Sequence, residues 1–396
     1  MSYLHKRSIL DIDVTGKRVI MRVDFNVPHQ NSIIQDDTRI RAALPSIQYL
    51  LEHKAAVILM SHLGRPKGKP NRLYTLRPVA KRLEELLKHP VTFIPECVGQ
   101  LVNQAVAEIR PGDVILLENL RFHPEEERNT PPFSAALASL ADIYVNDAFG
   151  TAHRAHSSTV GITVYLPSVA GFLIDKELHQ LGKLISDPEH PFVAIVGGAK
   201  ISDKIHVIEN LLSKVDRVLI GGGMANTFLA ASGHEMQGSL VEWESLDIAR
   251  TFLSSPLAQE RMVLPVDLVA AEKFAADSPF RAVEVDAIPA DWTALDIGPK
   301  TSQRYGEEIA QAKTIFWNGP MGVFEMDNFA QGTLAVARYI ASSHAFSVIG
   351  GGDSISAVNK AGVADQISHI CTGGGAALEF LEGKILPGVA ALDDKE

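Results

Sequence analysis

The 396-residue sequence is poor in cysteine and has no long hydrophobic run. Its two cysteines, Cys97 and Cys371, stand far apart and in no metal or redox spacing, so they are expected as small residues in or near a core, in a reducing compartment. The first residues, Met1 to Asp13, are followed by no apolar run long enough for a signal peptide, and no segment approaches the length of a membrane span. We therefore expect a cytoplasmic protein that has no membrane partner.

The chain also lacks an excess of basic charge. Its formal net charge is -10 and its pI is about 5.8, which argues against nucleic acid or an anionic membrane as the main partner. Hydrophobic residues make up 46% and charged residues 21% of the chain, as in ordinary globular proteins, and the length suits two domains. Local clusters of Arg and His stand out against this acidic background.

Two common nucleotide-binding motifs are missing. A Walker A loop requires Ser or Thr after Gly-Lys, and neither follows the Gly-Lys pairs that begin at Gly16, Gly68, Gly182 and Gly383. The first predicted strand is not followed by Gly-x-Gly-x-x-Gly, the dinucleotide fingerprint. A nicotinamide-dependent oxidoreductase, in which basic loops would hold a carboxylic acid, remains a competing interpretation without its fingerprint.

Predicted strands alternate with predicted helices along the whole chain. Helical spacing of apolar residues begins after Thr38, which can cap the helix, and again after Thr75. Such alternation predicts a doubly wound parallel sheet in each half. The strands are expected at residues 17–24, 55–60, 91–94, 114–117 and 143–145, and then at 192–196, 217–220, 262–264, 314–317 and 346–349.

A helical segment over residues 172–185 ends in Asp187-Pro-Glu-His-Pro191, which cannot continue a helix. We place a domain boundary there. An N-terminal domain is expected over residues 1–170, a joining helix over 171–186 and a C-terminal domain from 187. No flexible linker is seen, so any hinge is expected at the ends of the helix.

In the first half, polar loops follow the predicted strands. The carboxyl ends of parallel strands meet at one sheet edge, so these loops predict a concave anion pocket. A single Arg after a strand is ordinarily just solvated, and the histidines equally suit structural roles. The side chains concerned are Asp24, Asn26, Arg39, His62, Arg65, Arg121, His153, Arg154 and His156.

In the second half, glycine follows most predicted strands. The segment Gly197-Gly-Ala-Lys-Ile-Ser-Asp-Lys204 is expected to open a helix, with Lys200 and Lys204 one turn apart and directed at one phosphate. Glu325 and Asp353 suit a ribose hydroxyl and Mg²⁺, respectively. The plainer alternatives are tight turns for the glycines and helix N-caps for the two acids.

Several motifs together resemble one known family, the phosphoglycerate kinases, over essentially the whole chain. They are Arg22-Val-Asp-Phe-Asn-Val-Pro28, Ser61-His-Leu-Gly-Arg-Pro66, Glu118-Asn-Leu-Arg-Phe122, Ala148-Phe-Gly-Thr-Ala-His-Arg-Ala-His-Ser157, Gly197 to Lys204, Asn318-Gly-Pro-Met-Gly-Val-Phe-Glu325 and Thr372-Gly-Gly-Gly-Ala376. The resemblance implies an α/β fold of two Rossmann-like domains, joined by the interdomain helix with the active site in the cleft. It also implies that the C-terminal domain ends at 377, that a tail over 378–396 returns to the N-terminal domain, and that the protein is a monomer.

The resemblance further implies residue roles. Substrate binding falls to Asp24, Phe25, Asn26, Arg39, His62, Leu63, Gly64, Arg65, Arg121 and Arg154, and nucleotide binding to Lys204, Glu325, Gly351, Gly352, Asp353 and Ser354. Catalysis is expected from Arg39, Lys200, Lys204, Gly373 and Gly374, and Mg²⁺ at Asp353. The family often has Ser where this chain has Ala377, so that position is given no role.

The expected reaction is reversible phosphoryl transfer from 1,3-bisphosphoglycerate to MgADP, which gives 3-phosphoglycerate and MgATP. Such a transfer depends on positioning and charge neutralisation. With the two sites on different domains, closure about the joining helix is expected to bring the ligands together and exclude water. A nucleotide-binding or scaffold protein without turnover is the alternative from another class.

Overall fold

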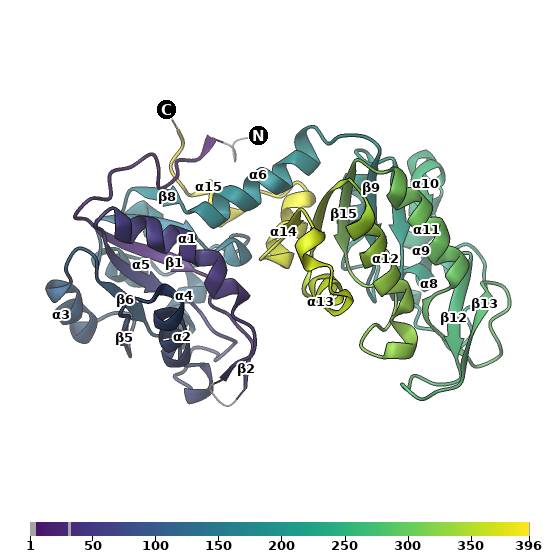
Figure 1. The fold of residues 1–396 in the computed structure, drawn as a ribbon, viewed down its shortest axis with the longest axis horizontal. Helices are drawn as coiled ribbons and strands as arrows, with labels where there is room; N and C mark the ends of the chain where they lie inside the picture. The colour runs from purple at the N-terminus through teal and green to yellow at the C-terminus, as the bar shows by residue number, and fades with distance from the viewer. Residues whose placement is uncertain (1–4, 31–32, 396) are drawn as a thin grey trace. The chain divides into compact units, whose positions relative to one another are not determined.

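The computed structural model describes residues 5–30 and 33–395, so residues 1–4 of the expected N-terminal domain and residue 396 of the expected tail lie outside the described residues. The chain forms two compact units (Figure 1). Unit 1 comprises Met1–His179 and Ile385–Glu396, and unit 2 comprises Gln180–Lys384. Helix α6 (Phe172–Ser186) carries the chain from unit 1 into unit 2.

Unit 1 is built on a parallel sheet of six strands. In spatial order these are β5 (Thr92–Ile94), β6 (Val114–Leu117), β4 (Ala56–Met60), β1 (Arg18–Val23), β7 (Ile143–Asp147) and β8 (Ser168–Ala170). All neighbouring pairs are parallel. The strands are short apolar runs, as a sheet covered on both faces requires. The parallel sheet expected from the alternation of elements is confirmed, whereas the short edge strand β8 was not predicted.

Helices flank the sheet of unit 1 (Figure 1). They are α1 (Thr38–Glu52), α2 (Arg77–Leu87), α3 (Gln100–Glu108), α4 (Pro124–Arg128) and α5 (Pro131–Ala138), with a short hairpin of β2 (His29–Gln30) and β3 (Ile33–Ile34) before α1. Ile40 and Ile47 of α1 are fully buried beside Val57 and Leu59 of β4. The expected cap at Thr38 is wrong: Asp37 is the N-cap residue, no side chain caps the helix, and Thr38 is its first residue.

The last segment of the chain returns to unit 1. Helix α15 (Pro387–Ala390) lies in it, and the Asn146 side chain of β7 donates to the Gly388 carbonyl at 3.0 Å. The Lys6 ammonium donates to the carbonyls of Ala390 and Leu392. Ala390 ends α15 and Leu392 follows just after it, so a cation is a favourable partner for these carbonyls. The segment therefore joins the two chain ends within unit 1.

Unit 2 also contains a parallel sheet of six strands, but its strand order differs: its third strand pairs with its second, whereas in unit 1 the fourth strand lies between them. Its parallel strands are β11 (Met262–Val263), β10 (Arg217–Ile220), β9 (Phe192–Val196), β15 (Thr314–Asn318), β16 (Phe346–Gly350) and β17 (His369–Ile370). The strands predicted at 192–196, 217–220, 314–317 and 346–349 are confirmed. The helices are α7 (Ile205–Leu212), α8 (Gly222–Ala231), α9 (Leu246–Leu253), α10 (Pro256–Arg261), α11 (Pro299–Gln311), α12 (Gln331–Ser342), α13 (Gly352–Ala361) and α14 (Gly374–Leu381).

A second, antiparallel sheet in unit 2 was not predicted. It has the order β13 (Phe280–Glu284), β12 (Asp267–Ala271), β14 (Thr293–Ile297). Leu268 and Ala270 of β12 pack with Ala294 of β14 in a separate small core. Because this sheet interrupts the strand–helix alternation, the reading of the second half as a plain repeat of the first is incomplete.

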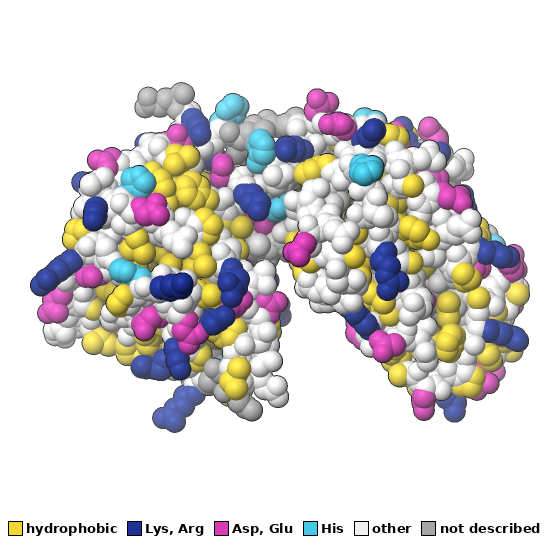
Figure 2. All heavy atoms as spheres, in the orientation of Figure 1, with side chains coloured by type: hydrophobic (Ala, Val, Ile, Leu, Met, Phe, Trp, Pro, Cys, Tyr) yellow, Lys and Arg dark blue, Asp and Glu magenta, His cyan; other side chains and the backbone are white. Residues whose placement is uncertain are grey.

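The helices and the visible surface can be compared with the expectations from length and charge. Among the described residues, no helix combines the length and the apolar character that a membrane span needs. On the face drawn in Figure 2, basic and acidic side chains are interspersed in both units. Both cysteines are buried, as expected from their spacing.

Candidate active site

Each parallel sheet has a switch point, where consecutive connections turn to opposite sides. In unit 1 the chain runs outward from β1 through β4 in one direction and through β7 in the other. In unit 2 the corresponding pair is β9 and β15. Ligands of open α/β sheets bind beyond the carboxyl ends of the strands at such a point. The loops that follow β1, β7, β9 and β15 are therefore the places to look for a site.

Arg22 at the end of β1 is a fully buried cation. Its guanidinium donates to Ser158 Oγ at 2.8 Å and lies 3.2 Å from His62 Nδ1. Ser158 Oγ in turn donates to Glu126 Oε1 at 2.5 Å, and Glu126 is also fully buried. Burial raises the pKa of Glu126 while Arg22 opposes that rise. A buried ion pair must satisfy its remaining polar atoms to be tolerated, and this network does so around Arg22.

The loop after β1 is tied to the loop after β4 and to the start of α1. Asp24 Oδ2 accepts from Arg39 Nη1 at 3.1 Å, and the same nitrogen donates to the Asn26 carbonyl. Asn26 Oδ1 accepts from the Gly64 amide at 2.8 Å, and the Gly64 carbonyl accepts from Arg121 Nη1. The structure thus joins residues from four separate segments in one hydrogen-bonded chain.

Other nitrogen atoms at this edge are buried without a hydrogen bond. Among the described residues, Arg121 Nη2, His153 Nδ1 and His156 Nδ1 have no hydrogen-bond partner, and Arg121 Nε lies only 3.3 Å from Glu127 Oε1 without hydrogen-bond geometry. A buried polar group that lacks a partner costs free energy, on the order of 1–3 kcal/mol. An anionic ligand would satisfy the Arg121 donor.

Burial and mutual repulsion weaken the basicity of this cluster. Burial and then the neighbouring Arg154 lower the pKa of Arg121 to about 10. Burial, followed by the Arg22 and Arg121 charges, lowers the pKa of His156 to about 3 and that of His62 well below its usual range. Both imidazoles are therefore neutral near pH 7. The positive field that suppresses them is the field that attracts an anion.

The remaining expected residues of this loop set differ in exposure. Phe25 is fully buried with its amide bonded to Ser61 Oγ, and Leu63 is 2% exposed, so both side chains serve the core. Arg154 is half-buried and donates to His153 Nε2. Arg65 is exposed and has no ion pair among the described residues. Of these four side chains, Arg65 is therefore the least constrained by its neighbours.

In unit 2, Lys204 spans the switch point. Its ammonium donates to the carbonyl of Gly197 after β9 at 2.6 Å and to that of Asn318 at the end of β15 at 3.2 Å. Burial lowers the pKa of Lys204 to about 8, and nearby Asp353 opposes this shift. Asn318 Nδ2 is buried and lacks a hydrogen bond among the described residues. The Lys204 ammonium and the unpaired Asn318 amide group therefore lie at the same switch point. The sequence analysis assigned Asn318 no role.

The expectation that Lys200 and Lys204 lie one turn apart on a helix is wrong. Helix α7 begins only at Ile205, with Lys204 at its N-cap. Gly198 has φ +126, a value that few other residues adopt. The residues between Gly198 and the start of α7 form bends and turns instead of helix. Lys204 therefore folds inward, whereas Lys200 is exposed and has no ion pair among the described residues.

Glycine at this edge permits backbones to approach closely. Gly319 has φ +96, and a Cβ there would collide with the Gly197 carbonyl. A Cβ on Gly374 would lie 3.0 Å from Gly351 Cα. Gly351 and Gly373 are the N-caps of α13 and α14, so both helices direct backbone N–H groups toward this edge. Close packing and exposed amides are thus two consequences of the same glycines.

The two acids are not helix N-caps. Gly351 is the N-cap of α13, Gly352 is its first residue, and Asp353 lies in its first turn. Glu325 stands in the exposed loop before the short turn at Asp327. Ser354 is fully buried, and its Oγ accepts from the Gly319 amide at 2.6 Å. Ser354 therefore supports the glycine loop, while Asp353 and Glu325 remain exposed at the cavity next to it.

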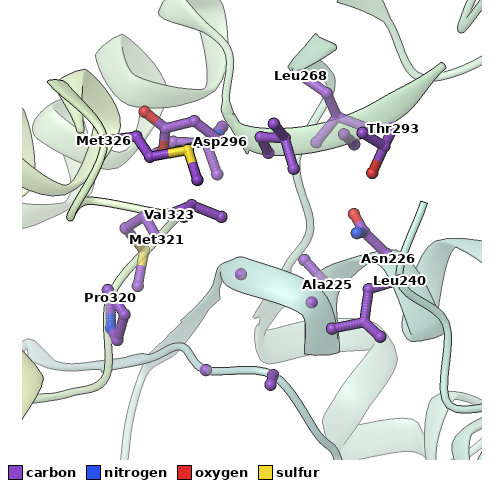
Figure 3. Close-up of a pocket in the computed structure, with 18 of the residues that line it drawn as sticks. Ala225, Asn226, Leu240, Leu268, Thr293, Asp296, Pro320, Met321, Val323 and Met326 are labelled. Carbon is purple, nitrogen blue, oxygen red and sulfur yellow. Dashed lines mark hydrogen bonds between the residues drawn. The ribbon is translucent and has the colours of Figure 1, made fainter. Parts of the chain in front are cut away.

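A cavity of about 550 Å³ opens beside these loops (Figure 3). The antiparallel sheet missed in the sequence supplies one wall through β14, and the loops after β9, β10 and β15 supply the others. Apolar side chains predominate on the walls, as in most small-molecule pockets. Its lining includes Gly198, Gly222, Leu240, Val323, Glu325 and Asp353.

Comparison with known proteins gives one consistent result. A family model described as phosphoglycerate kinase matches residues 9–384. The phosphoglycerate kinase of Moorella thermoacetica is 58% identical over 393 residues, which cover 98% of this chain and 100% of that protein. The enzyme of Pelotomaculum thermopropionicum is 56% identical over 391 residues, with 98% and 100% covered.

Solved structures agree. The structure of phosphoglycerate kinase from Coxiella burnetii is similar with a TM-score of 0.88 and 43% identity, and the match covers 98% of both chains. That from Pyrococcus horikoshii has a TM-score of 0.86 and 35% identity, again over 98% of both. These matches decide against the oxidoreductase interpretation. The chain belongs to the phosphoglycerate kinase family and is a kinase that transfers a phosphoryl group between 1,3-bisphosphoglycerate and ADP in glycolysis.

Proposed function

We propose that unit 1 binds the triose acid and unit 2 the nucleotide. The observation that carries this division is the set of buried nitrogen atoms without partners in unit 1, beside four arginines. 3-Phosphoglycerate carries a phosphate and a carboxylate, and guanidinium groups pair with both in bidentate fashion. The proposed binding residues are Asp24, Asn26, Arg39, His62, Gly64, Arg65, Arg121 and Arg154, with Phe25 and Leu63 as apolar supports.

In unit 2 the nucleotide lies along the edge from the cavity to the switch point. The base and ribose occupy the cavity, with Glu325 accepting from a ribose hydroxyl. The phosphates lie against Lys204, the Asn318 amide and the backbone of Gly351 to Ser354. Backbone N–H groups at a helix start and one buried ammonium suit phosphate oxygens.

Mg²⁺ fits the chemistry of Asp353. This carboxylate is exposed at the cavity and close enough to Lys204 to raise the pKa of that lysine. Hard oxygen ligands such as carboxylate and phosphate are those that Mg²⁺ prefers, and the ion usually takes one or two carboxylates together with substrate phosphates. When bound, Mg²⁺ neutralises charge on the nucleotide phosphates.

During transfer, a β-phosphate oxygen of ADP forms a bond to the phosphorus of the acyl phosphate, and the bond from that phosphorus to the carboxyl oxygen breaks. The carboxylate of 3-phosphoglycerate leaves with the electron pair. Arg39, Lys200 and the amides at Gly373 and Gly374 stabilise the oxygens of the group in flight, and Lys204 holds the nucleotide phosphates. No side chain needs to become covalently attached.

Direct transfer requires the reacting oxygen and phosphorus to come within about 3–3.5 Å of each other. We therefore propose that the two ligands are brought together by a hinge at the ends of α6, and that this step excludes water from the acyl phosphate. The protein is proposed to act as a cytoplasmic monomer. Compaction in small-angle scattering on addition of both substrates supports the hinge, whereas unchanged scattering contradicts it.

The assignment of ligands to units is tested with Arg121→Met. Calorimetric titration is expected to show 3-phosphoglycerate binding weakened about 10²-fold, because a charge-assisted pair is lost, and ADP binding unchanged. Arg128→Met is the matched control, because this nearby arginine is exposed and makes no ion pair among the described residues. Loss of ADP binding with intact 3-phosphoglycerate binding would reverse the assignment.

A further inference from the structure

The cavity of unit 2 is mainly apolar but has two polar side chains on opposite walls. Asn226 comes from α8, and Thr293 is the first residue of β14. In Figure 3 the Asn226 amide and the Thr293 hydroxyl are directed into the same space, with Leu240 beside Asn226. A few convergent polar groups in an apolar pocket are the usual means by which a pocket fixes the orientation of its ligand.

Asn226 is 4% exposed and, in the part of the chain that the structure describes, its side chain makes no hydrogen bond. Its neighbour Thr227 shows the ordinary situation: the hydroxyl donates to the Gly223 carbonyl and accepts from the Glu242 amide. An amide can use two donor and two acceptor positions, and those of Asn226 open to the cavity, where a ligand can fill them. The Asn226 side chain is therefore available to hydrogen-bond a ligand in the cavity.

Asp296 is a third polar residue on the lining, but it is already occupied. Its Oδ1 accepts from the Ile297 amide at 2.9 Å, and its Oδ2 accepts from the Gly332 amide at 2.8 Å. Burial raises the pKa of Asp296 to about 7. Its oxygens hold β14 to the start of α12, so recognition of a ligand is left to Asn226 and Thr293.

We propose that Asn226 and Thr293 hydrogen-bond the edge of the purine base that carries the substituent on carbon 6. This inference rests on the nucleotide site proposed above. An amide offers a donor beside an acceptor, which matches the amino group and neighbouring ring nitrogen of adenine, and the amide turned over matches the carbonyl and ring N–H of guanine. The Thr293 hydroxyl can donate or accept, so it suits either base. The pocket thus selects purines that bear a group at carbon 6.

The test compares two nucleotides that differ only at that position. Calorimetric titration of the full chain uses ADP and purine riboside 5′-diphosphate, which lacks the 6-amino group. We expect the wild-type protein to bind ADP roughly tenfold more tightly, the scale of one hydrogen bond. Asn226→Leu is expected to bind the two nucleotides equally. Asn359→Leu is the matched control, because Asn359 is an exposed asparagine on α13, and it should keep the preference.

The outcomes separate this inference from the nucleotide site itself. If the wild-type protein binds both nucleotides equally, or if Asn226→Leu keeps the preference for ADP, the inference is overturned while the site stands. If the wild-type protein binds neither, both are overturned. Thr293→Val provides a second variant in case Asn226→Leu does not fold, which circular dichroism shows, and it should reduce the preference for ADP about threefold.

Discussion

Both sheets have a switch point beside their first strand, but the two points differ in chemistry. In unit 1 the loops after β1 and β7 carry arginine, histidine and acidic side chains, and Arg22 and Glu126 are fully buried. In unit 2 the loops after β9 and β15 carry glycine, and Lys204 is the one cation bonded to both loop carbonyls among the described residues. Corresponding switch points therefore do not imply equal means of binding an anion.

The difference shows what each solution requires. Buried guanidinium groups need partners of their own, and the Arg22–Ser158–Glu126 network provides them. Backbone amides at helix starts carry no net charge and need no counterion, but they need glycine so that loops can approach. Unit 1 thus depends on individual side-chain charges, and unit 2 on backbone shape. The predictions below test that contrast.

The largest effect is expected at Arg39. If unit 1 works through side-chain charge, Arg39→Ala should lower kcat by about 10²–10⁴-fold, the scale of comparable electrostatic contributions. The measurement is ADP formation from MgATP that depends on 3-phosphoglycerate. Arg41→Ala is the control, because Arg41 is exposed on the same helix and pairs with Asp37. Equal activity of Arg39→Ala and the wild type would remove Arg39 from the mechanism.

A methyl group added at a glycine of the loops in unit 2 should disrupt their close approach. Gly319→Ala places Cβ against the Gly197 carbonyl and should lower the free energy of unfolding by roughly 3 kcal/mol and weaken ADP binding. Gly233→Ala shares the positive φ but has no atom within 4 Å of the added Cβ. It should cost only about 1 kcal/mol from backbone strain. Similar urea midpoints for the two variants would contradict the close-approach argument.

The contrast between side-chain charge in unit 1 and backbone shape in unit 2 is not complete, because both units contain a buried carboxyl group. Burial raises the pKa values of Asp147 in unit 1 and Asp296 in unit 2 to about 7, compared with about 3.9 in an unfolded chain. The folded protein therefore binds more protons than the unfolded chain between about pH 4 and pH 7, so these groups make stability fall as pH rises.

Asp296→Asn should remove on the order of 2 kcal/mol of that decline between pH 5 and pH 7, measured by urea unfolding. The Asn oxygen can still accept one of the two backbone hydrogen bonds that Asp296 accepts, so the comparison uses the slope of stability against pH and not its absolute value. Asp147→Asn, whose native Oδ1 accepts from the Leu173 amide at the start of α6, should flatten the same profile. Parallel profiles for the wild type and both variants would show that the carboxyl groups titrate normally.

The smallest effect concerns Lys204, the side-chain cation of unit 2. Burial lowers its pKa to about 8, so it is charged at pH 7 and loses its charge as pH rises through 8. The kcat/KM for ATP, which reports the nucleotide-free enzyme, should be about tenfold lower at pH 9 than at pH 7. Lys204→Arg should delay this fall to higher pH, because guanidinium stays protonated. An unchanged profile in Lys204→Arg would assign the fall to another group.

Much of the fold follows from sequence pattern. The apolar run at 192–196 and the alternation around Val19 and Val23 placed buried strands correctly, because only such strands fit a sheet covered on both faces. The antiparallel sheet was missed, although β14 forms a wall of the cavity. Its strands are as long as β9 and β15, but β13 is largely exposed, and the pairing of β12 with β14 depends on contacts far apart in the chain.

Part of the candidate site was also visible beforehand. Asp24, Arg39 and Arg121 were named because polar side chains after strands meet at one sheet edge, and the structure joins them. The roles of Ser158 and Glu126 as supports, and the orphaned amide of Asn318, were not named. Ser158 and Glu126 do not stand directly after a strand, so their role depends on which cation they contact in the folded chain.

By itself the sequence determined two α/β sheets, the motifs of the family and the contrast between basic and glycine-rich loops, because these depend on local pattern and composition. Only the tertiary structure decided that Lys204 folds between two loop carbonyls instead of extending a helix, and that Asn226 faces a cavity without a partner. Burial and hydrogen-bond partners are set by packing between distant segments. The pKa values and unmet hydrogen bonds that make a site therefore emerge only on folding.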